Sequence, residues 1–194
     1  MELLEPRIAP ATLTFVDFDG DTVTVKTSKG SDADLAAAAR LVADPGNPAH
    51  FQLQYLGLTE NPVFAKSNVT ITAKAASGGP GSADIGFIDA RGVDLGKVRV
   101  DGDLGRILAG DDNSATPGLK SLVVDSMGVK GLSTQDPGTA SFGSKIIGAL
   151  GSLTVRGDFK DVSLQVLGVA VDPDETVNSA VDGNGRIGFI RIEG

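Results

Sequence analysis

The chain of 194 residues contains no cysteine and no tryptophan, one histidine and one tyrosine. Without cysteine the protein has no disulfide, no thiolate metal site and no thiol nucleophile. Aromatic residues make up only 5% of the chain, so large rings cannot fill its core. The core must instead stack small and β-branched side chains. The 26 glycines are close to twice the usual share of about 7%, which fits a backbone built from many short strands and turns.

Long apolar runs and excess positive charge are also missing. No stretch reaches the ~18 apolar residues of a membrane-spanning helix. The first thirty residues contain no basic segment followed by an apolar one, so we expect no ordinary signal peptide there. The net charge is −8, and an acidic protein repels nucleic-acid phosphates and anionic membranes. We therefore expect neither a membrane span nor a nucleic-acid partner.

Catalytic motifs are equally scarce. The chain has no nucleophile elbow, no phosphate-binding loop and no pair of zinc ligands. The single histidine, His50, stands near Pro48 in a predicted loop that carries no Asp or Ser partner pattern. Such a histidine is expected to be solvent-exposed rather than catalytic. The sequence therefore indicates no catalytic residue.

The chain does contain a short strand pattern that occurs five times, at 86–92, 96–102, 120–126, 151–157 and 188–194. Within each copy two apolar residues alternate with outward positions, and a period of two indicates a strand with one buried face. Repetition of such strands between glycines indicates the stacked rungs of a β-solenoid. The residues predicted to face inward are Ile88 and Ala90, Val98 and Val100, Leu122 and Val124, Leu153 and Val155, and Ile190 and Ile192.

The spacing of the copies is uneven. The first two copies are 10 residues apart, which is too short for a solenoid turn of roughly 18–30 residues. We therefore expect these two copies to form two sides of one rung, or a hairpin that leads into the stack. The later steps are longer because they contain insertions at 109–118, 132–148 and 168–186. We expect these insertions to emerge along one edge of the stack.

The part of the chain before the repeats predicts a cap. Residues 12–29 read as a β-hairpin with an Asp-Gly turn. A helix is predicted over 31–44, with Ser31 and Asp34 as a capping box and Pro45-Gly46 as its stop. Two further strands are expected at 51–58 and 68–75, followed by a glycine-rich joint at 77–82.

Together these patterns predict an all-β fold, a right-handed parallel β-helix or β-solenoid capped by an N-terminal hairpin and a short helix. The predicted division is a cap at residues 1–82 and a repeat region at 83–194.

Two groups of acidic residues are the candidate sites. Asp17, Asp19 and Asp21 alternate around Gly20, and oxygen ligands at that spacing suit a hard cation such as calcium. The competing interpretation is a solvated turn in which Asp and Gly serve the local backbone. No other cofactor is expected. The second candidate is the edge formed by the insertions, where loops on a rigid scaffold bind ligands or acidic loops simply maintain solubility. Its acidic residues are Asp111, Asp112, Asp136, Asp172, Asp174, Glu175 and Asp182.

The N-terminus carries a family resemblance. Residues 2–10 (ELLEPRIAP) resemble the LEPR-type signature of large exported bacterial surface proteins. The segments TFVDFDGDTVTVKTS, LGKVRVDGDLGRILAGD and LGSLTVRGDFKDVSL are also similar to repeats of those proteins. The resemblance implies export to the cell surface or extracellular space and a parallel β-helix architecture. It implies no enzyme activity and supplies no catalytic residue.

We therefore expect a non-enzymatic structural or adhesive protein of the cell surface or extracellular space. The alternative is a carbohydrate-active module, a glycan binder, polysaccharide lyase or glycosidase, for which Arg91, Arg99 and Arg156 occupy outward strand positions. The last strand, 187–194, has no later repeat to cover it. It is expected to be an open edge that continues in a longer protein or self-associates, unless residues 168–186 fold over it.

Overall fold

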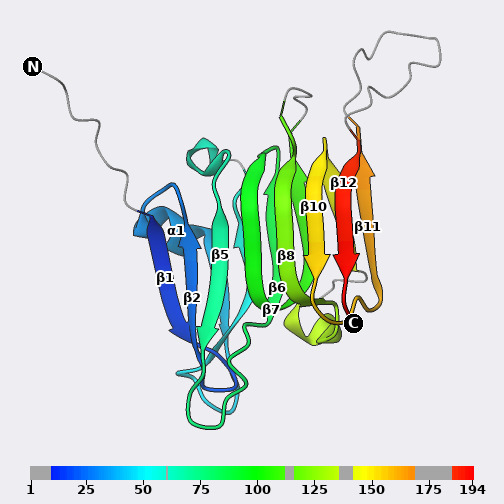
Figure 1. The fold of residues 1–194 in the computed structure, drawn as a ribbon. Helices are drawn as coiled ribbons and strands as arrows, with labels where there is room; N and C mark the ends of the chain where they lie inside the picture. Colours follow the sequence, from blue (N-terminus) through cyan, green and yellow to red (C-terminus); the bar gives the residue numbers. More distant parts are fainter. Residues whose placement is uncertain (1–9, 60, 112–115, 136–141, 169–184) are drawn as a thin grey trace, which may run out of the picture.

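Strands dominate the computed structural model, which describes residues 10–59, 61–111, 116–135, 142–168 and 185–194. Strand accounts for 56% of it and helix for 9%. Twelve strands form one large mixed sheet that does not close on itself (Figure 1). The expectation of a β-dominated fold is confirmed.

The sheet begins with antiparallel strands. Strands β1 (Ala11–Val16) and β2 (Thr22–Thr27) form the predicted hairpin, and β2 pairs antiparallel with β5 (Val69–Lys74). Val23 and Val25 of β2 are buried, as the alternating pattern predicts.

From β5 onward this side of the sheet is parallel. Strand β5 pairs with the first part of β7 (Leu95–Gly110), which pairs with β8 (Leu119–Met127). Strand β8 pairs with β10 (Leu150–Val155), and β10 with β12 (Ile187–Ile192). We call the series β1, β2, β5, β7, β8, β10 and β12 the first arm.

Four of the five sequence copies meet in the first arm, in register. The first inward residues form the row Val98, Leu122, Leu153 and Ile190, and the second inward residues form the row Val100, Val124, Val155 and Ile192. All of these side chains are buried except those of β12. Because a slip of one residue would turn every apolar side chain outward, burial fixes this register.

A second arm contains the remaining strands. It runs from β3 (Ala39–Ala43) through β4 (Phe51–Gly57), β6 (Ile85–Arg91), the second part of β7 and β9 (Phe142–Ile147) to β11 (Val162–Leu167). Its pairs are parallel from β4 to β11. Sequence copy one is β6 of this arm, whereas copy two is the first part of β7. The first two copies therefore lie on two sides.

Strand β7 joins the two arms through a bend. Its pairing with β8 shifts register between Val100 and Asp103, and the residue between Asp101 and Asp103 is Gly102, with φ +154°. A Cβ atom at Gly102 would overlap the carbonyl of Ala83, so only glycine fits this close approach. The inward side chains of both arms form one continuous apolar core.

The predicted helix is only half correct. Helix α1 (Asp32–Ala38) has the expected capping box, in which Asp34 N–H donates to Ser31 Oγ and Ser31 N–H donates to Asp34. Residues 39–43 are instead strand β3, paired antiparallel with β4. Ala39 is extended at the end of the helix because pairing with β4 outweighs the helix propensity of the alanine-rich segment.

The expectation that all insertions emerge along one edge is wrong. From β5 onward in the first arm and from β4 onward in the second, the strands of the two arms run in opposite directions, so strand ends alternate between two edges (Figure 1). Strands β7 and β11 end at one edge of the sheet. Strand β8 ends at the opposite edge, where the 3₁₀ helix η2 (Gly131–Thr134) follows it.

Strand pairing also crosses the predicted boundary at residue 83. Strand β4 pairs with β6, and β5 pairs with β7, so strands before and after this residue share each arm. The loop at 75–84 is the glycine-rich joint between β5 and β6. The division into a cap and a repeat region stays a prediction.

Candidate functional site

The Asp17–Asp21 turn joins β1 to β2 and is closed by its own backbone. Asp17 Oδ1 accepts the N–H of Asp19 at 3.0 Å and that of Asp21 at 2.8 Å. Burial raises the pKa of Asp17, and its two backbone hydrogen bonds only partly offset this effect. Gly20 adopts φ +87°, which favours glycine.

The carboxylate of Asp21 points away from the turn and is fully buried. It accepts the N–H of Ala76 at 2.8 Å and that of Gly81 at 2.6 Å. Asp21 therefore fastens the glycine-rich loop to the hairpin. Among the described residues no group of three or more His, Asp or Glu side chains is arranged to hold a metal ion. The calcium site at Asp17, Asp19 and Asp21 stays a prediction, while two of its three carboxylates serve backbone donors.

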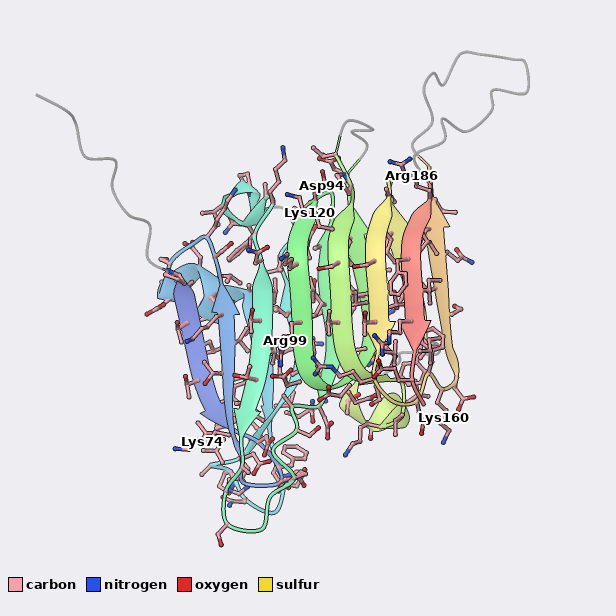
Figure 2. All side chains as sticks on the ribbon, viewed as in Figure 1. Lys74, Asp94, Arg99, Lys120, Lys160 and Arg186 are labelled. Atoms are coloured by element: carbon pink, nitrogen blue, oxygen red, sulfur yellow. The ribbon has the colours of Figure 1, made fainter. Side chains whose placement is uncertain are left out.

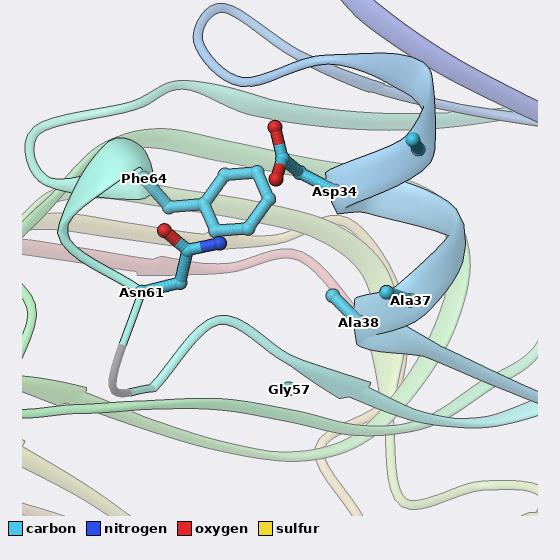
Figure 3. Close-up of a pocket in the computed structure, with 7 residues that line it drawn as sticks. Asp34, Ala37, Ala38, Gly57, Asn61 and Phe64 are labelled. Carbon is cyan, nitrogen blue, oxygen red and sulfur yellow. The ribbon is translucent and has the colours of Figure 1, made fainter.

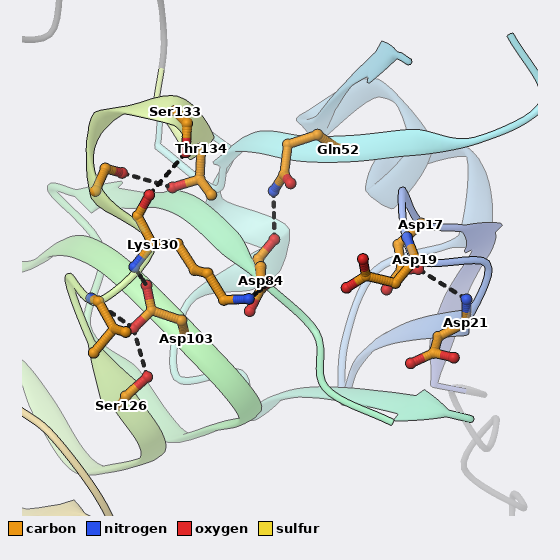
Figure 4. A network of polar contacts seen from close by, with 12 residues as sticks. Asp17, Asp19, Asp21, Gln52, Asp84, Asp103, Ser126, Lys130, Ser133 and Thr134 are labelled. Atoms are coloured by element: carbon orange, nitrogen blue, oxygen red, sulfur yellow. Dashed lines mark hydrogen bonds and ion pairs between the residues drawn. The ribbon is translucent and has the colours of Figure 1, made fainter. Parts of the chain in front are cut away.

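A second polar network lies beside this turn (Figure 4). The buried carboxylate of Asp103 accepts from Ser126 Oγ at 2.6 Å and from the backbone N–H groups of Val129 and Lys130. Lys130 Nζ pairs with Asp84 Oδ2 at 2.9 Å. Burial raises the pKa of Asp84 although Lys130 acts against it. These contacts hold η2 against the sheet.

Only one member of the predicted acidic edge lies in the described structure. Asp111 N–H donates to Asp94 Oδ1 at 3.3 Å, and Thr116 donates its hydroxyl to the other oxygen of Asp94. Asp94 lies at the upper edge in Figure 2, and burial raises its pKa. The other predicted residues, Asp112, Asp136, Asp172, Asp174, Glu175 and Asp182, lie outside the described residues.

The three outward arginines do not share one groove. On the first arm, where Figure 2 labels Arg99, Arg99 Nε pairs with Asp101 at 2.7 Å. On the same arm, Arg156 Nη1 pairs with Asp125 at 2.9 Å. Arg91 lies on the second arm, where it pairs with Asp89 at 2.7 Å. Each of these three arginines is thus paired with an aspartate within the described structure.

A hollow of about 330 Å³ lies between α1 and the 3₁₀ helix η1 (Pro62–Phe64), as Figure 3 shows. Its wall consists of Ala33, Asp34, Ala37, Ala38, Gly57, Asn61 and Phe64. The hydrogen bond from Ser31 lowers the pKa of Asp34, so its carboxylate is occupied as a helix cap. The remaining wall offers mostly alanine methyl groups and one ring, with little chemistry for catalysis.

The last strand, β12, has an unpaired backbone edge and exposed apolar side chains. It pairs on one side with β10, and among the described residues no strand pairs with its other side. The exposed fractions of its large side chains are 38% for Ile187, 55% for Phe189, 49% for Ile190 and 51% for Ile192. Leu167 at the end of the neighbouring β11 is also exposed. Such an edge is a template for pairing with another strand.

The opposite end of the sheet is protected. Helix α1 packs against β1, and Thr12 N–H on the edge of β1 donates to Asp32 Oδ1 at 2.6 Å. The edge strand of the second arm, β3, is only five residues long and its pairing is broken by a bulge at Arg40/Leu41. Short, bulged and covered edges are devices that prevent pairing. One end of the sheet is therefore protected against strand pairing, whereas β12 at the other end is exposed.

Comparison of the chain with known proteins finds no matching family model, no matching curated protein and no matching solved structure. Within the described residues, no helix has the length and apolar character needed to cross a membrane.

Sequence reasoning found the open strand and the repeat rows but missed the anchoring roles of Asp21 and Asp103. One feature of the sequence is related to these roles. Each aspartate is followed later in the chain by a glycine-containing loop, and the backbone N–H groups of such a loop need hydrogen-bond acceptors.

Proposed function

We propose that the protein is a right-handed β-solenoid with two strands per coil, one from each arm. The rows of identical register along β5, β7, β8, β10 and β12 support this architecture. The proposed hand follows from the strong preference for right-handed connections between parallel strands.

We further propose a non-enzymatic, structural or adhesive role at the cell surface or outside the cell. The observation that carries it is the contrast between a protected first end and an open, apolar last strand. A solenoid exposing such a strand is suited to extending or joining a larger assembly. The location outside the cell rests on the LEPR-type resemblance of residues 2–10.

The proposed occupant of the open end is a second copy of this chain. Head-to-tail stacking would bring β12 against the end covered by α1, so the copies would meet through β12 of each, related by a two-fold axis. The sequence of β12 favours pairing with a second β12, because it carries charges of both signs beside its apolar residues. Arg191 and Glu193 pair at 2.5 Å within one chain. Charges of opposite sign can form the same pair across a two-fold axis.

Light scattering across a concentration series tests this role. Self-association should raise the measured mass with concentration, and Ile190→Lys should lower it because a charge replaces a half-exposed apolar contact. Leu132→Lys is the matched control, since Leu132 is 51% exposed but lies on η2. A strict monomer at all concentrations, or an equal effect of both variants, would count against stacking through β12.

A further inference from the structure

The two arms of the sheet end at different strands. After β7 the chain alternates between them, with β8, β10 and β12 in the first arm and β9 and β11 in the second. Among the described residues, β12 therefore has no strand opposite it in the second arm. The inward side chains Leu153 and Val155 of β10 are buried, whereas Ile190 and Ile192 of β12 are about half exposed. We call the place beside β11 and opposite β12 the open position.

The edge of β11 that borders the open position has none of the usual protections. Strand β11 pairs with β9 and, within the described structure, with no other strand. Its sequence, VSLQVL at 162–167, has no charged residue, no proline and no glycine. Three of its apolar side chains pack against the core but are only half-buried, namely Val162, Leu164 and Val166. An uncharged, regular edge of this kind accepts a further strand.

The backbone groups on the free edges of β11 and β12 match each other. The carbonyl of Leu167 accepts the N–H of Gly148 at 2.7 Å and so points to the side of β9. The N–H of Glu193 donates to the carbonyl of Val155 in β10 at 3.0 Å. Backbone groups of successive residues in a strand point to alternate sides, so the groups on the free sides belong to inward residues. These are Leu164 and Val166 in β11, and Ile190 and Ile192 in β12.

We propose that β12 of a second copy occupies the open position and pairs antiparallel with β11, while β12 of the first copy does the same in the second. The proposal rests on the self-association proposed above and names the strand against which β12 lies. Strands β11 and β12 run in opposite directions (Figure 1). A two-fold axis parallel to the strands therefore sets β12 of one copy antiparallel to β11 of the other. Each arm of one copy then continues into an arm of the other.

Pairing of β12 with β12 is the competing arrangement. It brings the charges of Arg191 and Glu193 together, but exposed ion pairs contribute little to association. It also leaves the edge of β11 uncovered, because β12 lies beyond β11 in the order of the coils. The reciprocal arrangement covers both edges and brings Ile190 and Ile192 of the two copies together across the core. Because burial of apolar side chains outweighs exposed ion pairs, β12 is expected to lie against β11.

Disulfide cross-linking tests this pairing, because the chain has no cysteine of its own. Gln165 of β11 and Phe189 and Arg191 of β12 are exposed. Gln165→Cys is mixed with Phe189→Cys or with Arg191→Cys at equal concentrations and oxidised. If the two strands overlap over most of their length, one of these mixtures has Cα atoms within the roughly 7 Å that a disulfide allows. That mixture should form disulfide-linked dimers, whereas Gln165→Cys mixed with Leu132→Cys on η2 should not.

A lysine variant of β11 provides a second test, measured by light scattering. Leu167→Lys should raise the dissociation constant of the dimer roughly tenfold, because a charge replaces an exposed apolar contact. Leu132→Lys is the matched control and should change this constant by less than about twofold. The melting temperature of Leu167→Lys at low concentration should equal that of the wild type, which guards against loss of folding.

Three outcomes would overturn the proposal. A wild-type monomer at all concentrations would overturn it together with the proposed self-association. A concentration-dependent mass that Ile190→Lys lowers and Leu167→Lys leaves unchanged would overturn only the pairing with β11. Efficient cross-linking of Phe189→Cys or Arg191→Cys with itself, without cross-linking to Gln165→Cys, would replace this pairing by that of β12 with β12.

Discussion

Replacing Val124 by aspartate tests the inward register of the stack. Val124 is fully buried in the row between Val100 and Val155, and both of its row partners are apolar. Loss of a buried valine side chain costs about 1.5–3 kcal/mol. An uncompensated buried charge costs roughly 3–5 kcal/mol more. The total of about 5–8 kcal/mol approaches the entire stability of a typical domain, about 5–15 kcal/mol.

Val123→Asp is the matched control. Val123 is the neighbouring residue, is half-buried and faces outward, and it pairs with Arg99 across the sheet. An aspartate there gains a partly solvated arginine partner, so the change in the free energy of unfolding should stay within about 1 kcal/mol.

Urea unfolding followed by circular dichroism measures both variants. We expect Val124→Asp to be insoluble or to show no cooperative transition, whereas Val123→Asp unfolds like the wild type. The reverse order of damage would show that the register is wrong by one residue.

Three other measurements follow from the polar contacts. Asp21→Ala should lower the free energy of unfolding by about 1.5–3 kcal/mol, because the backbone N–H groups of Ala76 and Gly81 lose a charged acceptor. An unchanged melting temperature would contradict the anchoring role of Asp21. The pKa of Asp84 is raised above 3.8 in the folded state, so the folded protein binds this proton at a higher pH than the unfolded chain does. The free energy of unfolding should therefore rise as the pH falls through the folded-state pKa of Asp84. Asp84→Asn should remove this rise, and parallel pH profiles of the two proteins would refute the assignment. If Asp17, Asp19 and Asp21 hold calcium, millimolar calcium should raise the melting temperature and Asp19→Ala should abolish the rise, because a ligand that binds the native state stabilises it. An unchanged melting temperature would show that the three aspartates form only a structural turn.

The first arm was predictable because its strands alternate cleanly. In each copy from 96 to 194 two apolar residues are separated by one outward position, and these pairs stack in the predicted rows. The strands of the second arm after β6 escaped notice because small residues interrupt their alternation. Strand β9 reads FGSKII, with Ser144 turned inward to accept the N–H of Ile107.

The candidate site was less predictable for a different reason. The aspartates of the 17–21 turn are visible in the sequence, but the donors that Asp21 serves are 55 and 60 residues away. The cation–π contacts of Arg40 with Tyr55 and of Arg106 with Phe87 likewise join side chains of different strands that only the fold brings together. In β3, local propensity gave the wrong prediction because tertiary pairing with β4 outweighs it.

Hydrogen–deuterium exchange of the segment 185–194 at low and high protein concentration tests the central claim most directly. In an isolated chain, backbone N–H groups on the free side of β12 have no strand partner among the described residues, and they should exchange quickly. Pairing of β12 with a second copy should slow their exchange as concentration rises, and Ile190→Lys should abolish that dependence. Exchange that is the same at every concentration would contradict an assembly built through this strand.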